Sequence, residues 1–123
     1  QHLSTPIAAQ LNPDKRLLDG IQALHPTPAV GGLPRATAMS FIRRHEGFDR
    51  GWYAAPVGWL DSKGNGDFLV ALRSALITPQ HCHLFAGCGI VHGSWPADEY
   101  EETQIKLASM EHALLLFPRR SKT

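Results

Sequence analysis

The centre of the chain reads Phe68-Leu69-Val70-Ala71-Leu72-Arg73-Ser74-Ala75-Leu76-Ile77. Both alternating sets of positions are apolar, which predicts one strand buried on both faces. Arg73 puts a permanent cation into this stretch, and burying a charge without a partner costs several kcal/mol. The sequence therefore leaves three readings of Arg73: a pair with an internal Asp or Glu, a guanidinium that reaches past the strand edge, or bidentate binding of a ligand carboxylate.

Two further strands are predicted on either side of this stretch. Residues 52–60 are rich in aromatic side chains and valine, and residues 63–67 (Lys-Gly-Asn-Gly-Asp) form a strong turn signal. Residues 82–91 follow after a break at Pro79-Gln80. The two short connections predict a three-stranded antiparallel meander.

Helices are expected on both sides of the meander. Residues 14–24 place leucine and isoleucine on one side of a helix, and Pro34 suits the first turn of a second helix that ends near His45. Between them, residues 25–34 carry three prolines and two glycines, which predicts a shaped loop. Pro96 is expected to begin a long helix that ends near Leu116.

Size and charge limit the classes of function. The chain has 123 residues and a mass of 13.5 kDa, which predicts one domain with one core. Its net charge of +1 gives no electrostatic reason to expect nucleic acid or a membrane surface as a partner. Two cysteines cannot form a disulfide framework, so a reducing compartment is expected, the cytoplasm or a plastid.

The last predicted helix carries two carboxylates and a lysine on one face. Glu99, Glu102 and Lys106 are spaced i, i+3 and i+7, so they fall within about 60° of one another around the helix axis. One reading is a solvated face with an ordinary Glu102–Lys106 pair. The other is a site for a hard cation such as Mg²⁺, which takes one or two carboxylates and fills its remaining positions with water and substrate oxygens.

Residues 81–90 contain two further patterns, of which only one predicts a binding site. Gly87 and Gly89 interrupt an apolar strand, as expected where a ligand approaches the backbone closely and exposed amides bind a carboxylate oxygen. His81-Cys82-His83 offers metal donors, but neighbouring strand residues point to opposite faces and no Cys-x-x-Cys spacing supports zinc. We do not expect a metal at this second pattern.

Five blocks of the chain match a known family in order and spacing, over nearly the whole chain from Gln1 to about Leu115. The blocks are Leu24-His25-Pro26-Thr27-Pro28-Ala29-Val30-Gly31-Gly32, Phe48-Asp49-Arg50-Gly51-Trp52-Tyr53, Ala71-Leu72-Arg73-Ser74-Ala75, Phe85-Ala86-Gly87-Cys88-Gly89-Ile90-Val91 and Glu99-Tyr100-Glu101-Glu102-Thr103. Through them the chain resembles the C-terminal portion of isochorismate synthases, within the chorismate-utilising enzymes that include anthranilate, aminodeoxychorismate and salicylate synthases.

The resemblance implies an α+β fold of the anthranilate synthase component I type, with antiparallel sheets flanked by helices. Residues 1–118 would form the C-terminal part of a chorismate-binding domain, and residues 119–123 a frayed tail. The implied reaction is the Mg²⁺-dependent conversion of chorismate to isochorismate, in which water adds at one ring carbon while a hydroxyl leaves from another. Glu102 would be a direct Mg²⁺ ligand, and Glu99 a neighbouring carboxylate that supports the metal or its water.

The resemblance also assigns the substrate contacts. Lys106 would help to neutralise the ring carboxylate, which binds the metal. The enolpyruvyl carboxylate would be held by Arg73, Tyr53 and the backbone amide of Gly87. His2 would line the active site. Ala29 stands where lyases and anthranilate synthases usually carry threonine, which favours an isomerase.

Members of the family are several times longer than this chain. Their general base (a lysine), general acid (a glutamate) and first metal-binding glutamate lie before the position that matches Gln1. The chain alone is therefore expected to be inactive. It is also expected to expose apolar sheet surface, which either the missing part of the same fold or self-association would cover. The alternatives are a salicylate synthase or another lyase or aminase of the family, and a noncatalytic domain that binds a carboxylate or a protein.

Overall fold

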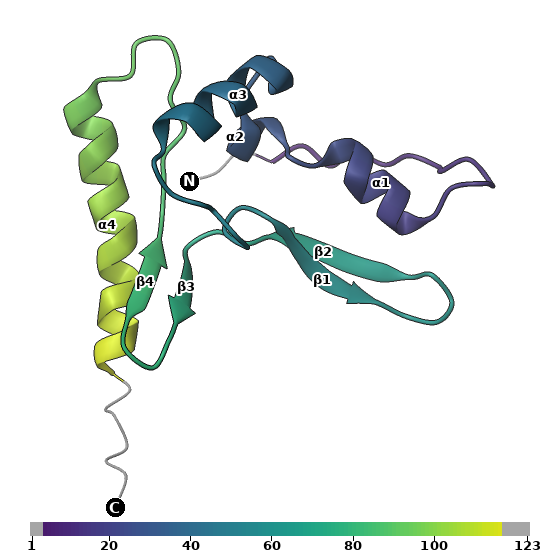
Figure 1. The fold of residues 1–123 in the computed structure, drawn as a ribbon. Helices are drawn as coiled ribbons and strands as arrows, with labels where there is room; N and C mark the ends of the chain where they lie inside the picture. The colour runs from purple at the N-terminus through teal and green to yellow at the C-terminus, as the bar shows by residue number, and fades with distance from the viewer. Residues whose placement is uncertain (1–3, 117–123) are drawn as a thin grey trace, which may run out of the picture.

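The computed structural model describes residues 4–116, so the expected tail at residues 119–123 lies outside the described part of the chain. The ribbon of Figure 1 shows an α+β arrangement, as the resemblance implied. Its elements are α1 (Leu17–Leu24), α2 (Pro28–Gly31), α3 (Arg35–His45), β1 (Pro56–Leu60), β2 (Gly66–Val70), β3 (Ser74–Ile77), β4 (Cys82–Phe85) and α4 (Pro96–Leu115).

The predicted helices are largely confirmed. α3 and α4 begin and end within a residue of the predicted bounds, since Pro34 and Pro96 each fix the backbone where a helix starts. α1 begins at Leu17, three residues later than predicted. The Lys15 amide closes a turn onto the Asn12 carbonyl (2.9 Å), and the Asp19 carboxylate accepts from the Arg16 amide (2.8 Å), so the chain turns before the helix begins.

The predicted three-stranded meander is wrong. The structure has two separate antiparallel hairpins, β1–β2 and β3–β4, with Gly58 opposite Phe68 in the first and Ala75 opposite Leu84 in the second. The strand predicted over residues 68–77 is divided at residues 71–73, and the strand predicted over 82–91 ends at Phe85. The region before β1 forms turns up to Ala54 rather than a strand from Trp52.

The division between β2 and β3 lies at Arg73. Its φ of 46° is in the left-handed region, which a non-glycine residue adopts at a cost and a strand does not tolerate. The apolar pattern continues through this position, so hydrophobicity alone could not reveal the break. The loop at residues 25–34 likewise differs from its prediction in detail, because it contains the short helix α2.

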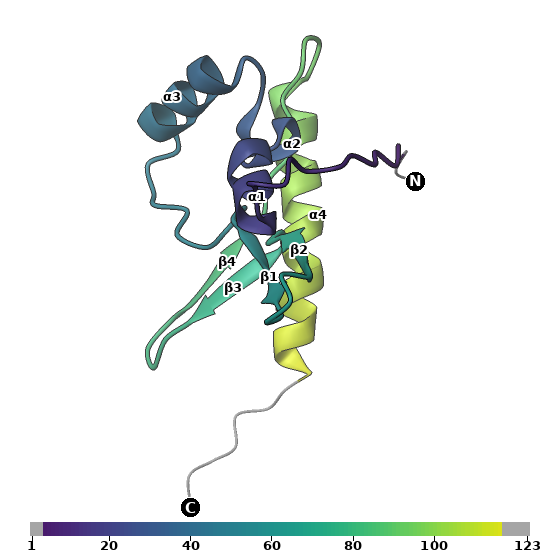
Figure 2. The same cartoon turned by 90° about the vertical axis from the view of Figure 1, so that its right-hand side faces the viewer.

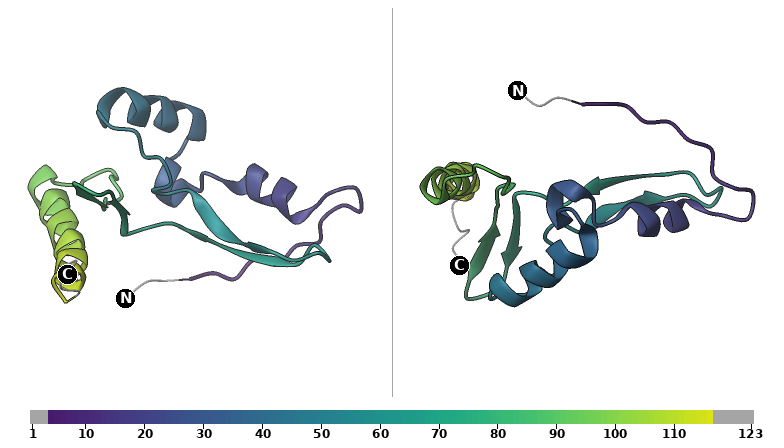
Figure 3. Two further views of the ribbon diagram at one scale, coloured as in Figure 1. Left: turned by 60° about the horizontal axis from the view of Figure 1, so that its bottom comes forward. Right: turned by 90° about the horizontal axis from the view of Figure 1, so that it is seen from above.

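The prediction of one core is also wrong. Among residues 4–116, Ala54 is the only buried hydrophobic residue, with an exposed fraction of 6%. The chain has an accessible surface of 11,125 Å², whereas a compact monomer of 13.5 kDa exposes about 6,500 Å². In Figure 3, α4 lies at one end of the molecule and the tip of the β1–β2 hairpin at the other. The elements therefore cover one another only in part.

The β1–β2 hairpin has one covered face and one bare face. Leu17 of α1 lies against Gly66, whose added Cβ would stand 2.7 Å from the leucine side chain. Val57, Trp59 and Leu69 share the opposite face, and their exposed fractions are 55%, 58% and 73%. The prediction that the chain exposes apolar sheet surface is thus confirmed, although the strands are not buried on two faces.

The helices of the described residues differ in length and in apolar character. α4 is the longest of them, and its 20 residues include charged side chains along its length. Across residues 4–116, no helix combines the length and the apolar character needed to cross a bilayer.

Candidate functional site

The candidate site lies where the segment after β4 runs beside α4. From Phe85 the chain passes along the helix to its first turn, and both Figure 1 and Figure 2 show the two segments side by side. Glu99 lies in the first turn of α4, Glu102 in the next, and Lys106 one turn further. Gly87 belongs to the segment that runs past them.

Lys106 joins the helix to that segment. Its Nζ donates to the main-chain oxygen of Gly87 (2.9 Å) and also to the Glu102 carboxylate. The ordinary i, i+4 pair that the sequence allowed is therefore formed, and its side chains are 24% (Lys106) and 54% (Glu102) exposed. An ion pair this exposed adds only about a few tenths of a kcal/mol to the free energy of unfolding. The arrangement therefore matters more for where it holds the Lys106 ammonium than for stability.

Glu99 is held by the turn that precedes the helix. The Ser94 hydroxyl donates to Glu99 Oε1, and the Thr103 hydroxyl donates to the Glu99 main-chain oxygen (3.0 Å). The Ser94 hydrogen bond is the main cause that lowers the pKa of Glu99, with the nearby Cys88 thiol and Lys106 ammonium acting in the same direction. Burial raises the pKa of the Cys88 thiol, so this cysteine is a poor nucleophile.

One oxygen of this carboxylate lacks a partner. Glu99 Oε2 is buried and accepts no hydrogen bond from an N–H or O–H group of the described chain, and the Cys88 thiol beside this carboxylate is only a weak donor. A buried carboxylate oxygen without a donor is expected to meet water or a cation. Glu99, Glu102 and Lys106 together carry a net charge of −1, so this donor set fits a divalent cation. Within residues 4–116, no three or more His, Cys, Asp or Glu side chains are grouped so that they could hold a metal ion by themselves.

Tyr53 reaches the same region from the turn before β1. A Cβ built on Gly87 would stand 2.8 Å from its hydroxyl oxygen. Its ring stacks on Phe85 at 5.6 Å, and burial is the main cause that raises its pKa. Glycine at position 87 therefore leaves room for the phenol, and a phenol that stays protonated is able to donate to an anion.

Arg50 holds Tyr53 and the α2 segment in place. Its guanidinium forms a bidentate pair with Glu46, donates to the Val30 carbonyl (2.9 Å) and lies 5.8 Å from the centre of the Tyr53 ring. The Glu46 hydrogen bond is the main cause that raises the pKa of Arg50. Ala29 lies in α2, one residue before the carbonyl that Arg50 binds, and is itself exposed.

The prediction that apolar neighbours bury Arg73 is wrong for this chain. Because its backbone turns out of the strand, the residue is exposed, and within residues 4–116 no carboxylate lies within 4.0 Å of its guanidinium. An apolar groove of about 460 Å³ beside Tyr53 is lined by neither Arg73 nor Glu102. The described chain thus brings Tyr53, Gly87 and the α4 residues together, and within residues 4–116 no side-chain hydrogen bond or ion pair joins Arg73 or Ala29 to them. His2 lies outside the described residues.

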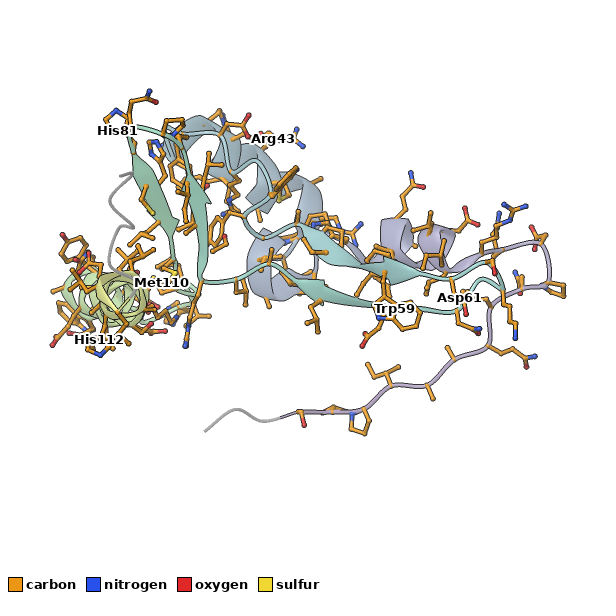
Figure 4. The ribbon with its side chains drawn as sticks, turned by 90° about the horizontal axis from the view of Figure 1, so that it is seen from below. Arg43, Trp59, Asp61, His81, Met110 and His112 are labelled. Carbon is orange, nitrogen blue, oxygen red and sulfur yellow. The ribbon has the colours of Figure 1, made fainter. Side chains whose placement is uncertain are left out.

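The side-chain view of Figure 4 shows how α4 is oriented. Met110 points from the helix toward the β3–β4 hairpin, whereas His112 points away from it. Leu107 also faces the hairpin, since it lines a groove with Leu84 and Phe85. His81 lies at the tip of the hairpin, and its ring centre is 6.0 Å from that of His83. These histidines are remote from the first turn of α4.

Two functional features were missed by the sequence analysis. Ser94 carried a usable signal, because it lies in a Gly-Ser turn two residues before the proline that starts α4. The Glu46–Arg50 pair also had one, since two opposite charges are spaced i, i+4 just after α3 ends at His45. Neither signal could show that the side chains would contact Glu99 and Tyr53.

The described chain is thus α+β, with a site that gathers carboxylates, a lysine and a tyrosine at the first turns of α4. A family model described as chorismate binding enzyme matches residues 1–115. The chain belongs to this family.

Two of the most similar relatives are named isochorismate synthases. The chain is 65% identical over 114 residues to the salicylate biosynthesis isochorismate synthase of Pseudomonas aeruginosa, and 57% identical over 114 residues to an isochorismate synthase of Bacillus subtilis. Each match covers 93% of this chain and 24% of the relative, so the chain spans about a quarter of the length of these relatives.

A solved structure also matches. It is described as a 2,3-dihydroxybenzoate-specific isochorismate synthase from Bacillus anthracis, with a TM-score of 0.79 and 40% sequence identity. The match covers 86% of this chain and 28% of that one. The open arrangement of helices and hairpins described here is thus shared with part of a larger folded protein.

Proposed function

We propose that the longer protein to which this chain belongs converts chorismate to isochorismate. Residues 1–118 would supply the C-terminal part of its chorismate-binding domain. The proposal rests on the family membership and on relatives of 57–65% identity that are named isochorismate synthases. Because the chain spans a quarter of their length, the general base and general acid are expected in the remainder of the protein.

The convergence of Gly87, Glu102, Lys106 and the Tyr53 hydroxyl is the observation that carries this proposal. A dicarboxylic substrate needs two anion-binding groups that are fixed relative to each other. In this arrangement the Lys106 ammonium and the Tyr53 phenol both lie against the Gly87 backbone. Lys106 would neutralise the ring carboxylate, and Tyr53 with the Gly87 amide would hold the enolpyruvyl carboxylate.

Arg73 and the residues at the edges of the site would complete the contacts. We propose that Arg73 binds the enolpyruvyl carboxylate, which its exposed guanidinium is free to do when the rest of the domain closes the site. Ala29 would leave space beside the ring, and His2 would line the pocket. Each would act by positioning the substrate rather than by moving a proton.

Glu102 and Glu99 would hold Mg²⁺. The unpartnered Glu99 Oε2 and the carboxylate of Glu102 supply the hard oxygen ligands that this ion prefers. When bound, the ion would neutralise the substrate carboxylate and orient the ring for exchange of its hydroxyl groups. Further oxygen ligands would come from water, from the substrate and from the remainder of the protein.

The product would feed salicylate, siderophore, menaquinone or phylloquinone synthesis. One relative is named for salicylate biosynthesis and another as specific for vibriobactin. We place the reaction in the cytoplasm, or in a plastid in a plant. The free thiols of Cys82 and Cys88 suit such a reducing compartment.

Product analysis of the full-length protein tests the proposal. Incubation with chorismate and Mg²⁺ should yield isochorismate by chromatography, with no release of pyruvate. Glu102→Gln should lower kcat/KM by about 100-fold, because a charged ligand is lost from the site. Glu101→Gln is the matched control, since its exposed carboxylate lies about 100° further around the same helix.

Four results would contradict parts of the proposal. Salicylate with pyruvate would identify a lyase, and an amino product would identify an aminase. An absence of turnover together with metal-independent carboxylate binding would identify a noncatalytic domain. Equal loss of activity in Glu101→Gln and Glu102→Gln would remove the assigned role of Glu102.

A further inference from the structure

The turn at residues 91–94 fixes one serine, Ser94, two residues before α4 begins at Pro96. The Ser94 amide donates to the Val91 carbonyl (3.0 Å), and the Val91 amide donates back to the Ser94 hydroxyl oxygen (3.1 Å). Gly93 has a φ of 91°, which glycine adopts without steric cost and which this turn requires. The Ser94 side chain is therefore held in one orientation by the backbone.

Within the described chain, the Ser94 hydroxyl donates to one acceptor, the Glu99 carboxylate. Because its oxygen already accepts from the Val91 amide, the hydroxyl turns its proton toward Glu99 Oε1. The contact crosses from the turn to the first turn of the helix. It is a charge-assisted hydrogen bond, which is stronger than one between neutral groups.

Helix capping does not account for this serine. The residue that precedes the first helical position of α4 is Trp95, and no side chain caps the free amides there. Ser94 lies one residue earlier, and its hydroxyl binds the Glu99 side chain rather than a helix amide. The bond therefore orients a carboxylate.

We infer that Ser94 is a positioning residue, which holds Glu99 Oε1 so that Oε2 is presented to the metal ion. The inference rests on the proposed magnesium site. Oε2 is buried without an N–H or O–H donor, and Thr103 binds the Glu99 main chain, so both ends of the residue are fixed. Removing a group that orients a metal ligand in this way typically weakens metal affinity by about 10- to 100-fold.

The experiment measures metal affinity in the full-length protein. Free Mn²⁺, as the probe for the Mg²⁺ site, is counted by electron paramagnetic resonance with chorismate at equilibrium with its product. Ser94→Ala should weaken the Mn²⁺ Kd by about 10-fold. Ser94→Thr keeps the hydroxyl and should remain close to the unchanged protein. Ser40→Ala, an exposed serine of α3, is the control for the substitution itself.

The outcomes separate this inference from the proposed function. If the unchanged protein binds no Mn²⁺, the magnesium proposal and the inference both fail. If it binds Mn²⁺ and Ser94→Ala binds equally well, the inference alone fails. A lower Tm in Ser94→Ala with an unchanged Kd would show a purely structural serine and would likewise overturn it. A weakened Kd in both the Ala and Thr variants would also count against the hydroxyl.

Discussion

Lys106 on α4 donates from Nζ to the main-chain oxygen of Gly87, 2.9 Å away and 19 positions earlier in the chain. The same ammonium contacts Glu102. A lysine placed between a carbonyl and a carboxylate has one N–H left for a further acceptor. The family resemblance assigns both Lys106 and Gly87 to substrate binding, and the structure brings them into direct contact.

Removing this lysine should affect the substrate more than the fold. In the full-length protein, Lys106→Ala should lower kcat/KM for chorismate by about 100-fold, because a positioned cation is lost. The unfolding free energy should change by less than about 1 kcal/mol, as expected for an exposed pair. Steady-state kinetics and urea unfolding measure the two effects, with Lys63→Ala as a control from the β1–β2 turn. Unchanged kcat/KM would show that Lys106 serves only the surface pair.

The space between Gly87 and Tyr53 gives a prediction on packing. In Gly87→Ala the new Cβ would stand 2.8 Å from the Tyr53 hydroxyl oxygen but 4.0 Å from the ring carbon that carries it. The substitution should destabilise the full-length protein by about 1–3 kcal/mol. Adding Tyr53→Phe should restore most of this loss, because the clash is with the hydroxyl alone. A double-mutant cycle by urea unfolding measures the coupling.

Gly89→Ala provides the control for this cycle. A Cβ at Gly89 would meet nothing within 4 Å, and its backbone needs no left-handed φ. Gly89→Ala should leave the unfolding free energy unchanged, both in the otherwise unchanged protein and in the Tyr53→Phe variant. Additive effects of Gly87→Ala and Tyr53→Phe would mean that the phenol does not lie against Gly87.

The β1–β2 turn provides a prediction on pH. The Asn65 side chain is the main cause that lowers the pKa of Asp61, helped by the Asn65 and Lys63 amides, which lie 2.8 Å from Asp61 Oδ1. A carboxyl with a lowered folded pKa adds stability above its unfolded pKa, near 3.8, and loses it as the pH falls through the folded value. The Asp61 contribution should therefore be full above about pH 5, decline as the pH falls through the unfolded and then the folded pKa, and vanish in stronger acid.

Carbon NMR of the Asp61 carboxyl measures this shift directly. The midpoint should lie below 3.8 in the unchanged protein and move upward in Asn65→Ala, which removes the largest cause. Ser62→Ala keeps all the bonds to Asp61 and should leave the midpoint where it was. The same midpoint in Asn65→Ala and the unchanged protein would contradict the assigned cause.

The sequence predicted the helices well because their ends carry local signals. Pro34 and Pro96 mark where α3 and α4 begin, and the i, i+3, i+7 spacing placed Glu99, Glu102 and Lys106 on one face. The helix face and its Glu102–Lys106 pair follow from helix geometry alone. The contact of Lys106 with Gly87 does not, since it depends on how the segment after β4 packs.

The strands were predicted less well because their division depends on a single backbone angle. Arg73 adopts a left-handed φ without being glycine, and no local pattern signals it. The same turn carries its guanidinium out of the apolar stretch, so the expected buried charge is exposed. The core could not be judged from composition either, since apolar residues at 43% gather here on faces that this chain does not cover.

The bare face of the β1–β2 hairpin provides the last prediction. Val57, Trp59 and Leu69 are all more than half exposed on it, and the whole chain exposes far more surface than a compact protein of its mass. Purified alone, the 123-residue chain should therefore self-associate, with an apparent mass by light scattering that rises with concentration. Trp59→Lys should shift the chain toward monomer, whereas Ser62→Lys, an exposed position in the β1–β2 turn, should not. A monodisperse monomer that unfolds cooperatively at all concentrations would show that this face needs no cover.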